Sequence, residues 1–350
     1  MGFKNLLIIL ITLALLWNCA GNDDPKKTET QQKEVAARDS VQQKIDSLSK
    51  VIRETPREDT LFYQRANYHL MNGDVNNAIN DMEIALKLNP DIPDYYLDLA
   101  EWELRRGESG IAKNLLEEMH KKFPENVEAM VRLANIYMAV EQYKEARTYL
   151  IKASRVEPEN AKLYLLSSMI FQEMGDAERA IDDLYNALKY DPNYYDAHIM
   201  LGLINAQLGK DVAIDHYMNA MRVQPDNPEA VYNLGMYYQG NKQYEKAIET
   251  YKKGLNNIDS THQHFLFNLG YILENYRANP DSAVYYYQRV IENYPEDYRA
   301  FYRIGQCHEA MGQEKKAMAS YEMCLKVNPD FDLAYNALSR LSEKYNKQRQ

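Results

Sequence analysis

The sequence predicts an all-α solenoid, which is a stack of similar helical hairpins. Three observations predict this fold class. Prolines recur at a nearly constant interval, an alanine stands at the same place in eight segments, and polar or glycine-containing turns divide most segments into two apolar-periodic halves. Self-similarity at a fixed period of about 20–50 residues is typical of repeat architectures, in which each unit buries one face only against its neighbours.

Prolines mark the ends of the predicted repeats. An interval of about 34 residues separates each proline from the next in the series Pro56, Pro90, Pro124, Pro158, Pro192 and Pro225. Pro295 and Pro329 repeat this interval, and the gap between Pro225 and Pro295 is about twice as long. Asp259 stands where the missing proline would fall. Eight repeats follow, covering residues 59–92, 93–126, 127–160, 161–194, 195–227, 228–261, 262–297 and 298–331.

Two further places in the repeat are restricted in size. The twentieth place holds Ala78, Ala112, Ala146, Ala180, Ala213, Ala247, Ala283 and Ala317. The eighth place holds Ala66, Ala100, Ala134, Ser168, Gly202, Gly235, Gly270 and Gly305. Two helices must approach closely at such places, and a larger side chain would wedge them apart. Large apolar residues stand four after each alanine, from Met82 to Tyr321, at helical spacing.

The segments that flank the repeats each predict one helix. Residues 332–350 continue the pattern of a first helix, and no second helix follows, so we expect a C-terminal capping helix. Residues 40–58 contain apolar residues three or four apart and predict a leading helix. These apolar residues are Val41, Ile45, Leu48 and Ile52.

The first residues have the composition of an export signal. Lys4 is followed by an almost unbroken apolar run from Leu6 to Leu16, and Cys19 comes shortly after it. The run is too short for a membrane-spanning helix, which needs about 20 apolar residues. We therefore expect residues 1–18 to be a cleaved signal peptide.

Residues 16–19 read Leu-Trp-Asn-Cys and resemble the lipobox of bacterial lipoproteins, although Asn18 stands where a small residue is usual. The resemblance implies that Cys19 becomes the lipid-modified N-terminus, which would hold the protein at a membrane face. The alternative is an ordinary secretory signal cut after a small residue such as Gly21. Residues 19–39 are polar and lack aromatic side chains, so we expect a flexible polar tether there.

The period of about 34 residues, with a small residue at the eighth place, alanine at the twentieth and proline at the thirty-second, resembles the tetratricopeptide repeat family. The resemblance covers residues 59–331. It implies a right-handed superhelix whose first helices line a concave groove, and a non-enzymatic role in binding other proteins.

The predicted groove is apolar. The fifth places of the first helices are apolar or aromatic in every repeat, and the ninth places are apolar in repeats four to seven. The proposed groove residues are Val131, Asn135, Leu165, Met169, Ile199, Leu203, Tyr232, Met236, Phe267, Tyr271 and Tyr302. Such a surface favours an apolar or amphipathic protein segment as the partner. The competing interpretation is that the fifth-place residues pack as framework between neighbouring helices.

Charge adds two hypotheses. The net charge of −10, with scattered basic residues, argues against a nucleic-acid partner, whose phosphates need a basic surface. Arg299, Arg303 and Arg340 gather near the C-terminal end of the predicted groove, where they would orient a partner or belong to an ordinary solvated face.

No motif for catalysis, cofactor binding or metal binding is apparent. The sequence has no glycine-rich phosphate loop, nucleophile elbow or zinc-binding cysteine pair, so we expect no enzyme activity, no cofactor and no metal. Cys307 and Cys324 fall where the repeat needs small residues, and buried free thiols are expected, with a disulfide as the alternative.

These observations together predict a scaffold or adaptor lipoprotein of the bacterial cell envelope. We expect an outer-membrane lipoprotein on the periplasmic face or the cell surface, with a role in secretion or envelope assembly. A structural protein that assembles with copies of itself is the alternative.

Overall fold

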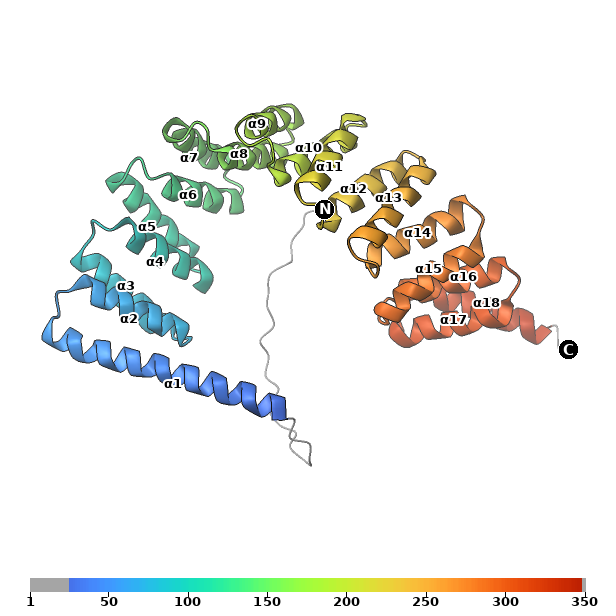
Figure 1. Ribbon diagram of the computed structural model, residues 1–350, viewed down its shortest axis with the longest axis horizontal. Helices are drawn as coiled ribbons and strands as arrows, with labels where there is room; N and C mark the ends of the chain where they lie inside the picture. Colours follow the sequence, from blue (N-terminus) through green and yellow to red (C-terminus); the bar gives the residue numbers. More distant parts are fainter. Residues whose placement is uncertain (1–24, 348–350) are drawn as a thin grey trace. The chain divides into compact units, whose positions relative to one another are not determined.

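A computed structural model describes residues 25–347, with side chains from residue 38 onward. Every regular element in that range is an α-helix. The helices form two compact units, one within residues 1–124 and the other within residues 125–350. In each unit, successive antiparallel helices lie side by side (Figure 1).

Unit 1 contains one long helix followed by two helical hairpins. Its helices are α1 (Pro25–Glu54), α2 (Asp59–Met71), α3 (Val75–Leu88), α4 (Pro93–Arg106) and α5 (Ser109–Lys122). The core of α1 to α4 gathers Phe62, Met82 and Trp102 around alanines at the eighth and twentieth places, Ala66 and Ala78.

Helix α1 is longer than the sequence pattern suggested. It begins at Pro25, so residues 25–39 of the expected tether are helical, and the expected leading helix ends at Glu54. The difference has a local cause. Residues 25–39 are rich in Lys, Gln, Glu and Ala, which favour helix, and Pro25 occupies a helix start, where its missing N–H costs nothing. Residues 19–24 lie outside the described range.

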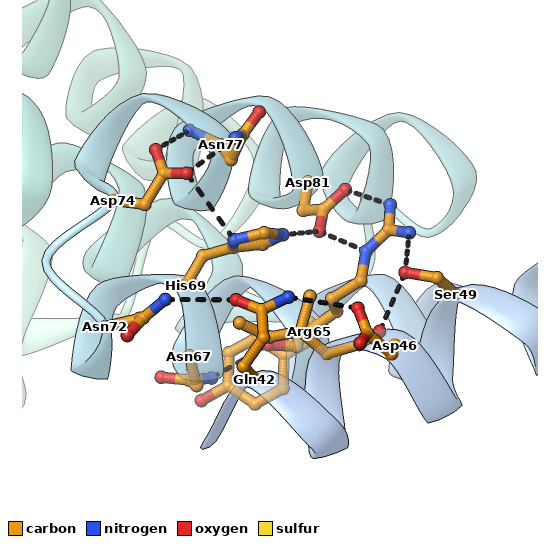
Figure 2. Close-up of polar contacts among 12 residues, drawn as sticks. Gln42, Asp46, Ser49, Arg65, Asn67, His69, Asn72, Asp74, Asn77 and Asp81 are labelled. Atoms are coloured by element: carbon orange, nitrogen blue, oxygen red, sulfur yellow. Dashed lines mark hydrogen bonds and ion pairs between the residues drawn. The ribbon is translucent and has the colours of Figure 1, made fainter. Parts of the chain in front are cut away.

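A polar network connects the first three helices of unit 1 (Figure 2). The Arg65 guanidinium of α2 donates two hydrogen bonds of 2.7 Å to the Asp81 carboxylate of α3 and a third, of 2.9 Å, to Ser49 of α1. Asp81 is 4% exposed, and the His69 ring lies 3.8 Å from it. The buried carboxylate therefore has its charge balanced within the hairpin.

Unit 2 contains six helical hairpins and a final single helix. Their first helices are α6 (Val127–Ala139), α8 (Ala161–Glu173), α10 (Tyr195–Gln207), α12 (Pro228–Gly240), α14 (Gln263–Tyr276) and α16 (Tyr298–Ala310). Their second helices are α7 (Tyr143–Val156), α9 (Ala177–Tyr190), α11 (Val212–Val223), α13 (Tyr244–Asn257), α15 (Pro280–Asn293) and α17 (Glu314–Val327). Helix α18 (Asp332–Lys347) packs on α17.

The eighth-place glycines of unit 2 each accommodate a tyrosine ring. A Cβ added at Gly202, Gly235, Gly270 or Gly305 would meet the ring of Tyr217, Tyr251, Tyr287 or Tyr321 at 2.3 to 2.7 Å. These tyrosines are essentially unexposed. Where the eighth place is alanine or serine, the facing residue is the smaller Met82, Leu116, Leu150 or Leu184. The size of one place therefore compensates the size of the other.

Cys307 and Cys324 are free and buried in the last hairpin. Cys307 packs in an apolar cluster of α12 to α16, and Cys324 packs in a second cluster of α16 to α18. Burial raises the pKa of the Cys307 thiol to about 12 and that of Cys324 to about 11, so neither forms a reactive thiolate near neutral pH. The expectation of buried free thiols is confirmed.

Candidate protein-binding face

The ninth-place side chains of three neighbouring first helices in unit 2 are exposed and apolar. Met169 of α8 is 39% exposed, Leu203 of α10 is 39% exposed and Met236 of α12 is 40% exposed. Asn135 of α6 is also exposed, and Tyr271 of α14 is half-buried. We call this surface, formed by the ninth places of α6 to α14, the first-helix face. Leu203 and Met236 line one hollow, and contiguous exposed apolar surface is typical of interaction sites.

Three of the proposed groove residues belong to the core instead. Val131, Leu165 and Ile199 are 5%, 8% and 5% exposed, and each packs in an apolar cluster with residues of neighbouring helices. The prediction that these fifth-place residues line an open groove is therefore wrong. The fifth place faces the second helix and the next repeat, so its apolar character serves packing.

The fifth places further along the chain are half-buried and carry aromatic rings. The Tyr232 ring lies 5.4 Å from His264, the Phe267 ring 5.3 Å from Tyr287, and the Tyr302 ring 5.6 Å from Tyr321. The first contact joins the first helices α12 and α14, and the other two join the helices of one hairpin, so these half-buried rings serve packing.

The arginines near the C-terminal end of the predicted groove are paired with nearby acids. Arg299 donates to Asp297 at 2.8 Å, and Arg340 lies 2.7 Å from a Glu309 carboxylate oxygen. Arg303 lies 3.6 Å from Glu274. Because each cation has a carboxylate partner, this end presents little unbalanced charge to a partner, which weakens the hypothesis that it orients one electrostatically.

A hollow of about 410 Å³ lies between α10 and α12, beneath Leu203 and Met236. Ala206 and Gln207 of α10, Tyr217 of α11, and Asn233, Tyr237, Gly240 and Asn241 of α12 complete its lining. No lining residue is charged. Its volume is at the lower end of the range of about 300–1,000 Å³ that is usual for ligand pockets.

The Tyr217 hydroxyl of this hollow has no hydrogen-bond partner among the described residues. Tyr217 is 1% exposed, and burial raises its pKa to about 12, so the hydroxyl stays neutral and can donate. Tyr237 differs, because its hydroxyl donates to Asp211 at 2.8 Å.

A second hollow, of about 370 Å³, occupies the corresponding place between α16 and α18. There the Tyr321 hydroxyl donates to Glu309 at 3.1 Å, and Arg340 of α18 donates to the same carboxylate at 2.9 Å. Both hollows lie at the same place in their repeats, and each is lined by the tyrosine that faces the eighth-place glycine. Only the second hollow contains charged side chains.

Of the residues that line the first hollow, the sequence interpretation placed only Leu203 and Met236 in the groove; it missed the other seven, among them Ala206, Tyr217 and Asn233. One signal could have identified it. The residue four after the eighth-place glycine is Glu274 or Glu309 in the last two repeats, whereas Ala206 at the same place leaves room beside the tyrosine.

The remaining expectations concern metal sites, membrane spans and the N-terminal residues. No group of three or more potential metal-ligating side chains occurs in the described part of the chain. No helix within residues 25–347 is both long and apolar enough to cross a bilayer. Cys19 and residues 1–18 lie outside the described range.

Comparison with known proteins identifies the repeats. Models of the tetratricopeptide repeat match residues 63–109, 103–170, 165–213, 216–249, 265–297 and 298–331.

Two curated relatives and one solved structure are similar to the chain. The BBSome complex member BBS4 of Bos taurus is 25% identical over 215 residues, which are 59% of this chain and 40% of that protein. The protein CTR9 homolog of Arabidopsis thaliana is 21% identical over 356 residues, covering 96% of this chain and 31% of that protein. The chain thus spans less than half the length of either relative.

The solved structure is the C-terminal part of a TPR repeat-containing protein from Cytophaga hutchinsonii. It is 20% identical, covers 68% of this chain and 98% of that one, and has a TM-score of 0.57. This likeness shows the all-α solenoid fold. With family models matching most of the region from residue 63 to residue 331, the chain belongs to the tetratricopeptide repeat family.

Proposed function

We propose that this chain is a non-enzymatic scaffold of the bacterial cell envelope, which binds a segment of a partner protein on the first-helix face of unit 2. A lipid on Cys19 would anchor it to the outer membrane, and its role would be in secretion or envelope assembly. The observation that carries the binding site is the row of exposed apolar side chains at Met169, Leu203 and Met236, on three consecutive first helices.

Two further observations support this proposal. Tetratricopeptide repeat proteins are protein-interaction scaffolds, and the relative BBS4 is named as a member of a complex. Methionine is flexible and polarisable, so Met169 and Met236 can adapt to an apolar partner. The envelope location rests on the N-terminal sequence, where an apolar run precedes Cys19.

Substitution on the first helices and on the second helices of unit 2 tests the binding site. Replacing Met169, Leu203 and Met236 with Asp places charge on the first-helix face. The matched control replaces Ile151, Met218 and Met323 with Asp; these side chains are 40%, 55% and 40% exposed on the second helices α7, α11 and α17.

Both variants should keep the wild-type helical circular dichroism signal, because all six side chains are substantially exposed. Proteins captured from envelope extracts are then identified by mass spectrometry. We expect one envelope protein to be lost with the first variant and retained with the control. Equal capture by the wild type and both variants would exclude the first-helix face.

Self-assembly is a second candidate function. Leu333 and Tyr335 of the last helix, α18, are 56% and 64% exposed, so the end of unit 2 has apolar side chains available for another copy. Sedimentation at increasing protein concentration tests this, since self-association raises the mass and replacing both residues with Asp should abolish the rise. A constant monomer mass would exclude it.

A further inference from the structure

We infer that the hollow between α10 and α12 is the specificity pocket of the first-helix face, and that it accepts an uncharged partner segment. One large apolar side chain of that segment would fill the hollow, and a neutral carbonyl oxygen would accept the hydrogen bond that Tyr217 can donate. This inference rests on the proposed function and adds to it the chemistry of the ligand.

The Tyr217 hydroxyl is a hydrogen-bond donor without an acceptor among the residues that the structure describes. In three hairpins of unit 2, the tyrosine beside the eighth-place glycine has a polar partner. The Tyr251 hydroxyl accepts from Asn268 at 3.1 Å, and the Tyr287 and Tyr321 hydroxyls donate to Glu274 at 2.8 Å and Glu309 at 3.1 Å. The Tyr217 hydroxyl has no such partner in the described chain. The Tyr217 hydroxyl stays accessible from the hollow, so a ligand acceptor there can replace water as its hydrogen-bond partner.

The Tyr217 hydroxyl lacks a partner in the described part of the chain because the residue four places after Gly202 is small. Glu274 and Glu309 stand four residues after their glycines, and the corresponding residue after Gly202 is Ala206. Alanine lacks the carboxylate and leaves its space within the hollow that Ala206 lines. A partner atom can therefore occupy the place that a resident side chain fills in the last two hairpins.

The charge of the lining decides which ligand charge fits. The hollow between α16 and α18 contains the Glu309 carboxylate together with Arg340. In the hollow between α10 and α12, Met236 stands at the place of Arg340, and the lining has no cation. A buried carboxylate without a cation is costly, so a neutral acceptor fits this hollow better than an acidic one. The apolar rims, Leu203 and Met236, favour an apolar side chain in the same ligand.

Two blocked amino acids that differ in one charge test this ligand class on the full chain. N-acetyl-phenylalanine amide has an apolar side chain and only neutral carbonyls, whereas N-acetyl-phenylalanine has the same ring and a free carboxylate. The chain is labelled with ¹³C at its methionine methyl groups. The Met236 methyl reports on the hollow, and the Met169 methyl is an internal control, because it is similarly exposed but does not line the hollow.

We expect the amide to shift the Met236 signal in a saturable way at millimolar concentration, with the Met169 signal unchanged and the acid at least fivefold weaker. Ala206→Glu should abolish the response, because the new carboxylate accepts from Tyr217 as Glu309 does from Tyr321. Tyr217→Phe should weaken binding about three- to tenfold, which corresponds to one hydrogen bond. Tyr321→Phe, in the other hollow, should change nothing.

Three results would contradict the inference. An unmoved Met236 signal, an equal response in Ala206→Glu, or tighter binding of the acid would each overturn the inference. If Ala206→Glu fails to fold, Leu203→Gln replaces it, since Leu203 is exposed and the change removes one apolar rim. If partner capture depends on the first-helix face while Met236 does not respond, this inference fails and the proposed function stands. If Met236 responds while capture is unaffected, the hollow binds this ligand class, but the proposed function fails and with it the role of the hollow in partner specificity.

Discussion

At the residue scale, the fit between a small residue and its large neighbour decides how each hairpin closes. The ring of Tyr251 occupies the space beside Gly235, so close that an added Cβ would lie 2.3 Å from a ring carbon. In the hairpin of α6 and α7, Ala134 faces Leu150, and both are buried. Each pair fills the same volume in a different way, so exchanging one member alone should disturb the packing.

We predict that Gly235→Ala lowers the free energy of unfolding of unit 2 by about 1–3 kcal/mol, the usual cost of overpacking a core. Adding Tyr251→Leu should restore part of the loss, because alanine with leucine is the combination found in α6 and α7. Urea denaturation followed by circular dichroism measures both. If the double variant were as unstable as the sum of the two single variants, the two sites would not be coupled.

At the element scale, single polar contacts connect neighbouring helices. In unit 2, a chain of hydrogen bonds joins α9, α10 and α11. The Tyr185 hydroxyl lies 3.3 Å from His216 Nε2, the two Nδ1 atoms of His216 and His198 are 3.3 Å apart, and His198 Nε2 lies 3.1 Å from the Pro192 carbonyl oxygen. The carbonyl can only accept, so His198 donates to it and His216 donates to His198. Both rings are then neutral and fully paired.

This arrangement predicts a loss of stability in acid. Burial lowers the pKa of His216 to about 4, with His198 adding to the shift and Asp215 opposing it. Burial also lowers the pKa of His198, and Arg222 adds to that shift while the Pro192 carbonyl and Asp191 oppose it.

The His216 imidazole binds a proton near pH 6.5 in the unfolded chain but only near pH 4 in the folded one. Its contribution to stability is therefore full above about pH 6.5 and falls towards pH 4. Urea midpoints measured between pH 4 and 7 should show this decline, and His216→Asn should make it shallower, with burial of His262 and His308 contributing the remainder. An unchanged slope in that variant would remove the pair as its cause.

In unit 1, we predict that the Arg65–Asp81 contact contributes to stability. Arg65→Ala leaves the buried Asp81 carboxylate without its main partner, and we expect a loss of about 2–4 kcal/mol. Replacing both residues, Arg65→Met with Asp81→Leu, should recover most of it, because no buried charge remains. Fluorescence of Trp102, which lies in the same core cluster, follows the unfolding of the chain produced without residues 1–18, because Trp17 is the other tryptophan. Equal stability of the wild type and Arg65→Ala would mean that the contact is not structural.

At the scale of the whole molecule, spacing alone predicted the repeats, because solenoid repeats impose the same size limits at the same places. It did not predict how far each place is exposed. Val131 and Met169 are both apolar at helical spacing, yet one is 5% and the other 39% exposed, since exposure depends on the neighbouring repeat. The sequence pattern did not reveal the hollow beside Tyr217 either. That hollow exists because Ala206 is small, and a small residue gives no periodic signal.

Photo-crosslinking in cells tests the central claim, that a partner segment binds the first-helix face of unit 2, most directly. A photoreactive phenylalanine analogue replaces Met236 on α12 in one variant and Met218 on α11 in another; they are 40% and 55% exposed. We predict that the variant labelled at Met236 forms a crosslink to one protein of the envelope and that the variant labelled at Met218 does not. Crosslinking only from Met218, or from neither position, would contradict the account.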